Sequence, residues 1–285
     1  MKRNRVLVLG ATGMLGSQVA RVLGKENCID LATTTRTVLD AGAATVESIE
    51  TFVSGFDYVV NCIGIIKPHI QDTNPALVER ALRVNALFPL QLGRAARKTK
   101  VRVLQIATDC VYSGAKGSYV ESDAHDALDV YGKSKSLGEV NFDGVNHLRC
   151  SIIGPELKGH LSLLDWFRKQ KPGAQLTGFT NHFWNGVTTL HFARLCAGII
   201  KSGLELPHLT HVIPSGKISK HEMLVRFQKA YVRPDLEILA KPAGQNVDRT
   251  LATEDPDRNL ALWRAAGYAS GPPTVPQMIE EMAAS

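Results

Sequence analysis

The stretch Gly10-Ala11-Thr12-Gly13-Met14-Leu15-Gly16 forms a glycine-rich turn with the spacing G-x-x-G-x-x-G. It directly follows the apolar run RVLVL at residues 5–9 and precedes a helical pattern at residues 17–23. Glycines at these positions allow a tight turn, close approach of the backbone to phosphate, and tight packing of helix on strand. The helix N-terminus offers unpaired N–H groups to a pyrophosphate. This context predicts a dinucleotide-binding turn, with a purely structural strand–helix turn as the alternative.

Further short apolar runs alternate with stretches of helical spacing through the first half of the chain. Strands are predicted at residues 5–9, 29–35, 57–62, 101–107, 147–153 and 208–213. Helices are predicted between them, at residues 17–23, 45–54, 75–98, 130–140 and 188–201. Strands separated by helices form βαβ units with right-handed crossovers. The predicted fold class is therefore α/β, with a Rossmann-type doubly wound parallel sheet.

The second half of the chain is less regular and predicts a smaller C-terminal substrate lobe built from several insertions. We expect residues 1–153 and about 186–213 to form the NAD(P)-binding domain, and about 154–185 and 214–285 to form the lobe. Helical spacing recurs at residues 161–169, 219–230, 256–266 and 276–284, while residues 241–249 are predicted to be a loop.

Composition excludes several classes of protein. The 285 residues are 44% apolar and 21% charged, which is typical of a globular chain and not of a disordered or coiled-coil one. No apolar run approaches the roughly 18–20 residues needed to cross a membrane, and the basic start of the chain lacks the long apolar core of a secretory signal. The five cysteines are scattered without metal-ligand spacing, which predicts reduced thiols, no metal site and a cytoplasmic location. The net charge of +6 fits either a solvated basic surface or attraction to a small polyanion such as a phosphorylated cofactor, and no motif for nucleic-acid binding is present.

The end of the second predicted strand selects between the two nicotinamide cofactors. A carboxylate at that position binds the adenosine ribose, whereas an arginine accommodates a 2′-phosphate. The strand ends in Thr33-Thr34-Thr35-Arg36-Thr37, and Asp30 lies too early to serve. Arg36 therefore favours NADP(H), with NAD(H) possible if Arg36 is a surface residue that points elsewhere. Asp40 could accept a hydrogen bond from the adenine amino group or cap a helix.

Tyr131 and Lys135 lie at positions i and i+4 of a predicted helix and share one face, whereas Lys133 points away. A tyrosine with a pKa of about 10 is a poor acid–base catalyst at neutral pH. A nearby ammonium favours the phenolate, so we expect Lys135 to lower the pKa of Tyr131 by about three units. The pair is a candidate catalytic site because it follows a glycine-rich turn in a βαβ chain.

Polar residues follow two other predicted strands, at the sheet edge where ligands of α/β proteins bind. Thr108 follows the fourth strand and is placed to hydrogen-bond a substrate carbonyl beside Tyr131, with capping of the strand end as the alternative. Asp109 could order this loop or bind substrate hydroxyls. After the third strand, Asn61-Cys62-Ile63-Gly64 is expected to pass under the cofactor ribose, and Asn85 to bind backbone or water near Lys135.

Together these segments resemble the extended short-chain dehydrogenase/reductase family. The closer likeness is to its dTDP-4-dehydrorhamnose reductase-like group of nucleotide-sugar 4-keto reductases. The motifs that carry it are the turn at 10–16, VNCIG at 60–64, Asn85, TDCVYSG at 108–114, YGKSKSLGE at 131–139 and LRCSIIG at 148–154. The Thr-Asp-x-Val-aromatic segment is the most specific of these motifs to the group.

The resemblance implies a cytoplasmic NAD(P)H-dependent oxidoreductase with a Thr–Tyr–Lys catalytic set. Thr108 then orients the keto oxygen, Tyr131 donates the proton, and Lys135 binds the nicotinamide ribose. The implied cofactor contacts are Gly10, Thr12, Gly13, Met14, Leu15, Arg36, Asp40, Cys62, Ile63, Gly64, Ala107, Tyr131, Lys135 and Ser151, with Arg149 nearby. The implied substrate contacts are Thr108, Asp109, Trp184 and Asn185 in NHFWN at residues 181–185, and Arg249 for the diphosphate. The family also implies a homodimer.

Three departures from the group leave alternatives open. Ala107 stands where the group often has serine, Cys62-Ile63-Gly64 replaces an alanine-rich version, and the surroundings of Trp184 differ. The nucleotide can therefore be dTDP, UDP or GDP. An epimerase or dehydratase on the same scaffold is a second hypothesis, although a dehydratase usually needs a glutamate next to the catalytic threonine. A non-catalytic NADP-binding regulatory subunit is a third.

Overall fold

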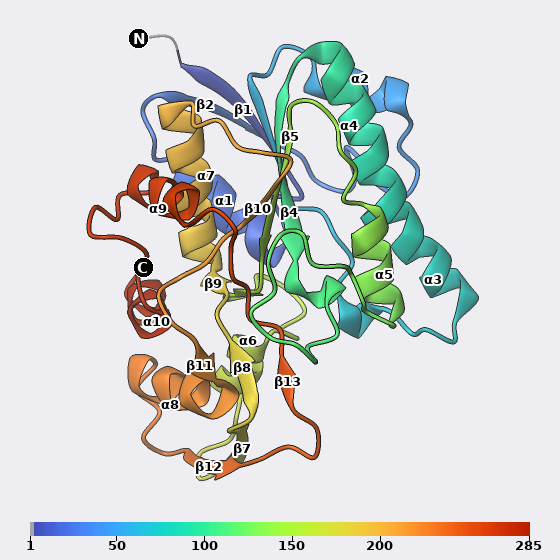
Figure 1. Cartoon of the computed structure of the whole chain (residues 1–285). Coiled ribbons are helices and arrows are strands. Elements are labelled where there is room, and N and C mark those ends of the chain that lie inside the picture. Colours follow the sequence, from blue (N-terminus) through green and yellow to red (C-terminus); the bar gives the residue numbers. More distant parts are fainter. Residues whose placement is uncertain (1–2) are drawn as a thin grey trace.

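The computed structural model describes residues 3–285; Met1 and Lys2, which open the basic N-terminal stretch, lie outside the described residues. Within residues 3–285, six strands form the central sheet: β1 (Asn4–Leu9), β2 (Ile29–Thr33), β3 (Tyr58–Asn61), β4 (Arg102–Thr108), β5 (Val145–Cys150) and β10 (Leu209–His211). All neighbouring pairs are parallel, in the spatial order β10-β5-β4-β3-β1-β2 (Figure 1). The order reverses between β1 and β3, which makes this edge of the sheet the expected place for a ligand.

Helices cover both faces of this sheet (Figure 1). One layer contains α1 (Met14–Leu23), α7 (Thr189–Ser202) and α9 (Pro256–Ala265), and the other contains α2 (Val46–Val53), α3 (Pro75–Leu82), α4 (Phe88–Thr99) and α5 (Val130–Leu137). Strand β1 explains the arrangement, because Val6 and Val8 pack in the core with α1 and α7, whereas Leu7 and Leu9 pack in the core with α2 and α4. A strand buried on both faces reads as a continuous apolar run. The predicted α/β class with a doubly wound sheet is confirmed.

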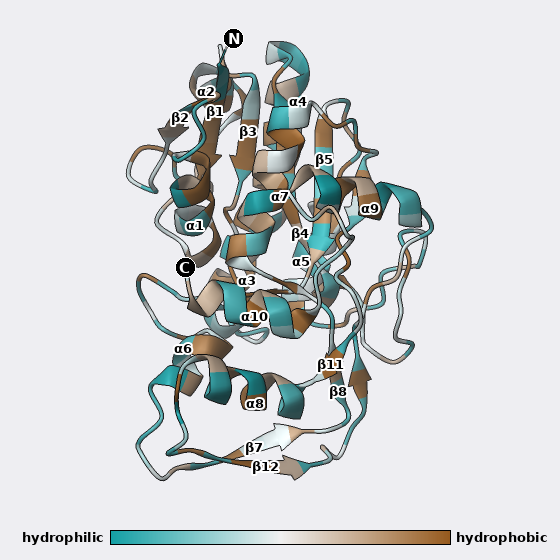
Figure 2. Cartoon of the chain, turned by 90° about the vertical axis from the view of Figure 1, so that its left-hand side faces the viewer, coloured by the Kyte–Doolittle hydropathy of each residue, from teal (hydrophilic) through white to brown (hydrophobic). Residues whose placement is uncertain are grey.

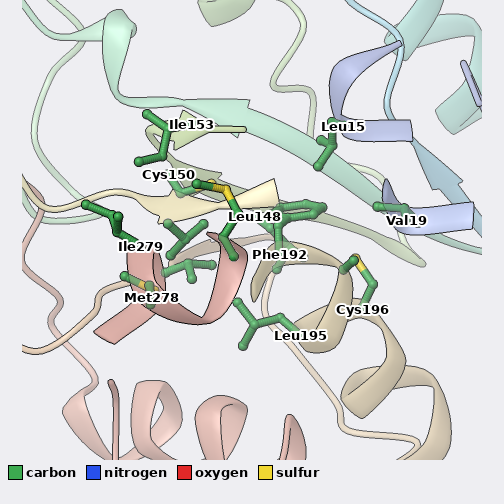
Figure 3. Packing of buried hydrophobic residues seen from close by; sticks show 14 of the residues in the cluster. Leu15, Val19, Leu148, Cys150, Ile153, Phe192, Leu195, Cys196, Met278 and Ile279 are labelled. Carbon is green, nitrogen blue, oxygen red and sulfur yellow. The ribbon is translucent and has the colours of Figure 1, made fainter. Parts of the chain in front are cut away.

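The largest hydrophobic core of the described residues joins the sheet to the C-terminal part of the chain (Figure 3). Leu15 and Val19 of α1 and Phe192 of α7 meet there with Met278 and Ile279 of α10 (Val275–Ala283). Figure 2 shows the same distribution, with largely hydrophobic sheet strands and a mostly hydrophilic α8 (Lys220–Ala230) at the periphery. No helix within residues 3–285 is both long and apolar enough to span a bilayer.

Two predicted elements are divided in the structure. The predicted strand at 147–153 breaks at Ser151, so that β5 ends at Cys150 and β6 (Ile152–Ile153) instead pairs with β9 (Val187–Thr188). The predicted helix at 75–98 consists of α3, a π-helical turn η2 (Arg83–Leu87) and α4. A π-turn inserts one residue into the helical repeat, and such turns occur frequently at functional sites.

The lower part of Figure 1 holds small sheets that the sequence did not predict. Strand β7 (Gln175–Phe179) pairs with β12 (Glu237–Lys241), and β8 (His182–Trp184) lies between β11 (Ile218–Ser219) and β13 (Val247–Asp248). Helix α6 (Leu163–Arg168) and α8 accompany them. Strand β13 and the end of β12 fall in the predicted loop 241–249. The 3-10 turns η1 (Lys67–His69) and η3 (Asp109–Val111) complete the described elements.

Candidate active site

The three glycines of the turn between β1 and α1 have different structural roles. Gly10 has a φ of +77°, a conformation that glycine adopts without strain. At Gly16 a Cβ atom would lie 2.1 Å from the Gly10 carbonyl oxygen, so only glycine fits there. Gly13 has an ordinary backbone, and a Cβ atom there would meet only the Gly10 oxygen at 3.4 Å. Gly10 and Gly16 therefore shape the turn, whereas Gly13 keeps its outer side open.

Helix α1 begins without a side-chain cap, because its N-cap residue is Gly13. Apart from α4, which continues from the π-helical turn, the other described α-helices are capped by a side chain that accepts a backbone N–H; the caps are Thr45, Asn74, Asp129, Ser162, Thr188, Ser219, Asp255 and Thr274. The first N–H groups of a helix need an external acceptor. An uncapped N-terminus next to a glycine turn is suited to an anionic ligand such as a pyrophosphate.

A cavity of about 480 Å³ extends from this turn toward the end of β2. It is lined by Gly10, Thr12, Gly13, Cys62, Ile63 and Gly64 at one end and by Arg36, Asp40, Arg80 and Arg83 at the other. Arg36 lies 3.6 Å from Asp40, whose carboxylate also accepts the Gly42 N–H at 2.9 Å. Sequence reasoning missed Arg80 and Arg83, although their i, i+3 spacing in the predicted helix 75–98 places them on one face.

A second cavity of about 480 Å³ adjoins the first and shares Thr12, Gly13, Cys62, Ile63 and Gly64 with it. It brings together most of the remaining residues that the sequence singled out: Met14, Leu15, Ala107, Thr108, Asp109, Tyr131, Lys135, Ser151 and Trp184. His69, Glu156, Lys158 and Lys220 also line it and were not anticipated. Residues from the glycine turn and the start of α1, the loop after β3, β4, α5, β5 and the C-terminal segments thus converge at one edge of the sheet.

Thr108 and Tyr131 interact in this cavity. Thr108 caps the turn η3 by accepting the Cys110 N–H at 3.2 Å, and its hydroxyl lies 3.3 Å from the Asp109 carboxylate. Burial raises the pKa of Tyr131, and a hydrogen bond with Thr108 opposes this effect. The expected lowering of that pKa by Lys135 is therefore wrong for the cofactor-free chain. Desolvation of a buried phenolate outweighs the favourable interactions present.

Lys135 is buried and anchored to the backbone of β4. Its ammonium donates a hydrogen bond to the Ile106 carbonyl oxygen at 3.0 Å. Burial lowers the pKa of Lys135, and the nearby Glu139 carboxylate opposes this shift. The amine is thus positioned in the cavity wall, beside Tyr131 on the same face of α5.

Asn85 fixes the loop that follows β3. Its side chain, which is buried in the π-helical turn, accepts the Ile65 N–H at 2.8 Å and donates to the Ile65 carbonyl at 3.0 Å and to Ser134 Oγ at 3.1 Å. These bonds tie the 62–65 loop to helix α5 between Tyr131 and Lys135. The expectation that Asn85 binds backbone near Lys135 is confirmed.

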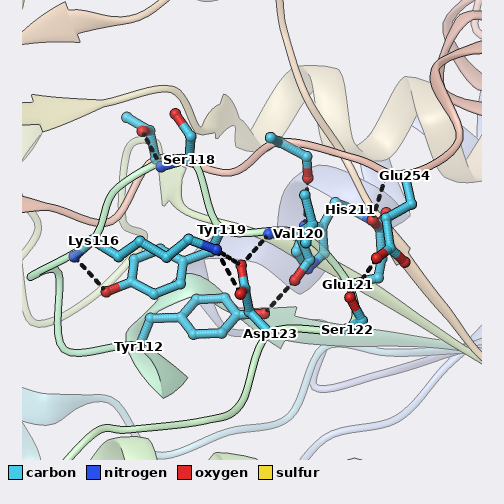
Figure 4. Close-up of polar contacts among 12 residues, drawn as sticks. Tyr112, Lys116, Ser118, Tyr119, Val120, Glu121, Ser122, Asp123, His211 and Glu254 are labelled. Atoms are coloured by element: carbon cyan, nitrogen blue, oxygen red, sulfur yellow. Dashed lines mark hydrogen bonds and ion pairs between the residues drawn. The ribbon is translucent and has the colours of Figure 1, made fainter.

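The segment after Thr108 is held by the C-terminal part of the chain (Figure 4). The Tyr119 ring stacks on Tyr112 with centroids 4.1 Å apart, and its hydroxyl accepts the Gly114 and Lys116 N–H groups at 3.1 Å. Glu121 accepts hydrogen bonds from the His211 and Glu254 N–H groups, each at 3.0 Å, and from Thr253 Oγ1 at 2.8 Å. We call residues 112–126 and 248–254 the clamp. It connects the segment that follows Thr108 to residues more than 120 positions away in the sequence.

Three predicted site residues have structural partners. The Asn185 amide donates to the Leu251 carbonyl at 2.8 Å and accepts the Leu251 N–H at 2.9 Å, and it does not line the cavity. Arg249 donates to the Tyr112 carbonyl at 2.9 Å and acts on the cavity through its charge, which opposes the burial-induced rise in the pKa of Asp109. Arg149, expected near the nicotinamide, is fully buried against Glu139, Tyr112 and His125 and lies outside the cavity lining.

A known protein family matches the part of the chain that contains these residues. The family described as the RmlD substrate binding domain matches residues 4–155, which include the glycine turn, Thr108, Tyr131 and Lys135. The chain belongs to this family.

All five cysteines are free thiols, as their spacing predicted.

Individual relatives of this family member are distant. A dTDP-4-dehydrorhamnose reductase from Mycobacterium tuberculosis is 30% identical over 145 residues, which is 48% of this chain and 45% of the relative, so the match spans less than half of that protein. The methionine adenosyltransferase 2 subunit beta of Danio rerio is 27% identical over 269 residues, covering 86% and 80% of the two chains. The fold resembles that of a Bacillus anthracis dTDP-4-dehydrorhamnose reductase solved in complex with NADP, with a TM-score of 0.77 and 17% identity over 98% of each chain.

Proposed function

We propose that this chain is an NADPH-dependent reductase of the 4-keto group of a nucleotide-linked 6-deoxysugar, able to use NADH less well. The convergence of Thr108, Tyr131 and Lys135 in a cavity that adjoins the uncapped glycine turn carries this proposal. This arrangement suits reduction of a carbonyl group, because a proton donor, a hydroxyl that can bind the carbonyl and a fixed cation lie at one edge of the sheet. The reductase relatives in the same family support the reaction class.

The first cavity fits a dinucleotide. The open side of Gly13 and the free N–H groups of α1 would hold the pyrophosphate. Arg36, together with Arg80 and Arg83 in the lining of the same cavity, would hold the 2′-phosphate that distinguishes NADPH from NADH. Asp40, Cys62, Ile63, Gly64, Ala107 and Ser151 would line the adenosine and ribose positions. When bound, NADPH supplies the hydride that reduces the sugar carbonyl.

Tyr131 is suited to donate the proton. Because burial raises its pKa, the phenol stays protonated at neutral pH and can give a proton to the alkoxide oxygen that forms at C4. Thr108 would hydrogen-bond the same oxygen and keep it beside Tyr131. The Lys135 ammonium would stabilise the phenolate left after proton transfer and bind the nicotinamide ribose. Asp109 would accept a hydrogen bond from a sugar hydroxyl.

The remaining part of the proposal concerns the surroundings of this site. Residues about 154–185 and 214–285 would form the lobe that binds the nucleotide sugar, with residues 1–153 and about 186–213 as the cofactor domain. Trp184 lies in the cavity wall on the lobe side, and the positive charge of Arg249 acts on Asp109 in the same cavity. We further propose that the chain is cytoplasmic, since free thiols suit a reducing compartment. We also propose that it forms a homodimer, as the family resemblance implies.

The test offers the purified chain NADPH or NADH with dTDP-, UDP- and GDP-linked 4-keto-6-deoxysugars and follows the absorbance of the reduced nicotinamide. The proposal expects stoichiometric loss of NADPH with at least one donor. Tightly held NAD that is never consumed would instead indicate an epimerase or dehydratase. NADPH binding without oxidation by any donor would indicate a non-catalytic subunit, for which the long match to methionine adenosyltransferase 2 subunit beta provides a specific reason.

A further inference from the structure

Lys220 occupies an unexplained position in the second cavity. It is the first residue of α8 and lines the same cavity as Thr108, Asp109 and Tyr131. The preceding Ser219 and the following Glu222 form a capping box, with the Ser219 N–H donating to Glu222 at 2.7 Å. The start of α8 is thereby fixed, and with it the backbone from which the Lys220 side chain extends.

Trp184 supports the Lys220 amine. The ammonium nitrogen lies 5.6 Å from the centre of the indole ring, within the range of a cation–π contact. Trp184 itself is 4% exposed and packs in the large core, so its ring is a rigid base for the amine. This arrangement gives Trp184 a positioning role toward Lys220.

Among the described residues, the amine of Lys220 has no oxygen acceptor. Its one hydrogen-bond partner there is the Met223 sulfur at 4.0 Å, which is a weak acceptor. Lys217, three residues earlier, shows the usual arrangement, with its amine 2.9 Å from the Asp248 carboxylate. The amine of this half-buried lysine faces the cavity without an oxygen acceptor, so a ligand that supplies one would gain a charge-assisted hydrogen bond.

The electrostatic surroundings of Lys220 are mixed. Burial lowers the pKa of its amine to about 8, Asp109 and Cys110 oppose this shift, and Arg249 adds to it. The amine is therefore still mostly protonated at neutral pH. Lys220 and Arg249 together place positive charge beside the reacting end of the cavity, where Asp109 is the nearby carboxylate.

We propose that Lys220 binds an oxyanion of the nucleotide sugar and thereby determines substrate specificity. The oxyanion is the diphosphate, whose negatively charged oxygens supply the acceptor that the amine lacks. This inference rests on the proposed function, since it assumes that a nucleotide sugar enters the second cavity.

The test compares Lys220→Met with Lys229→Met, an exposed lysine on the same helix that serves as the control. Dissociation constants are measured by calorimetry for UDP, dTDP, UDP-glucose and UDP-glucuronate, and separately for NADPH. We expect Lys220→Met to weaken binding of the affected nucleotides by about tenfold or more. NADPH affinity should stay within about twofold of the parent value in both variants, and Lys220→Arg should restore most of the lost nucleotide affinity.

The pattern of losses tests the assignment to the diphosphate. A loss shared by UDP, dTDP and both UDP-sugars assigns Lys220 to the diphosphate, whereas a loss confined to UDP-glucuronate overturns this assignment. Wild-type-like affinity of a folded Lys220→Met or Lys220→Gln variant for all four nucleotides overturns the inference while leaving the proposed function intact. Failure of the wild-type chain to bind any nucleotide overturns the proposed function and the inference with it.

Discussion

Alanine substitutions at Gly13 and Gly16 should separate cofactor binding from folding. At Gly16 a Cβ atom would lie 2.1 Å from the Gly10 oxygen and 2.7 Å from its carbonyl carbon. Both are backbone atoms, so no rotamer change relieves the contact, and overpacking of this kind costs about 3 kcal/mol or more. The better helix propensity of alanine returns about 1 kcal/mol. We therefore expect Gly16→Ala to lose about 2 kcal/mol of unfolding free energy.

Gly13→Ala has the opposite expected outcome. Its φ of −83° suits alanine, and the 3.4 Å contact is ordinary, so the free energy of unfolding should change by less than about 1 kcal/mol. The added methyl group occupies the side where the pyrophosphate would approach, so NADPH should bind at least about tenfold more weakly. Urea unfolding without cofactor and fluorescence titration with NADPH measure the two effects. Equal stability of the two variants, or unchanged NADPH affinity of Gly13→Ala, would refute the reasoning.

Three further outcomes are expected. Tyr131→Phe should lower kcat by about a hundredfold to ten-thousandfold while NADPH affinity is retained; full turnover in the spectrophotometric assay would remove Tyr131 as the proton donor. Arg36→Ala should raise the KM for NADPH about fivefold and leave the KM for NADH unchanged, because the exposed guanidinium would contact only the 2′-phosphate. Equal effects on both KM values would show that Arg36 does not bind the 2′-phosphate. Acid should destabilise the chain below about pH 6.5, because the unfolded chain takes up protons on histidines that burial keeps neutral in the folded state. Each of these histidines lowers the free energy of unfolding by about 1.4 kcal/mol per pH unit, until the pH reaches its pKa in the folded chain. That pKa is about 3 for His147 and about 4 for His191 and His211. The loss is measured as a falling midpoint of urea unfolding, and a midpoint that stays constant from pH 7 to 5 would contradict the prediction.

The central sheet could be predicted from the sequence because its strands are buried on both faces. Runs such as RVLVL at residues 5–9 and VRVLQIA at 101–107 are largely apolar segments bounded by loops, and both form strands of the sheet. Strands β7 and β12 were missed because they are partly exposed, so polar and small residues interrupt their apolar pattern. The break at Ser151 was missed because pairing of Ile152 and Ile153 with β9 is a tertiary contact.

The candidate site was predictable where a motif follows a strand and less so elsewhere. Thr108, Tyr131 and the glycine turn occur at fixed positions along βαβ units, so their proximity followed from topology. The direction of the Tyr131 pKa shift depends on burial, which no local pattern reveals. Lys220 begins a helix far along the chain, and nothing in its neighbours in sequence indicates that it reaches the same cavity. Asn185 has a typical ligand-binding side chain, but both of its polar groups are used by Leu251.

The clamp has a consequence for chimeric proteins built from members of this family. Glu121 and Tyr119 form hydrogen bonds with residues of the 248–254 segment, so the two segments of the clamp stabilise each other. A hybrid that takes residues 112–126 from one parent and 248–254 from another would lose these hydrogen bonds, and the segment that follows Thr108 would no longer be held in place. Successful recombination of substrate preference should therefore require both segments to come from the same parent.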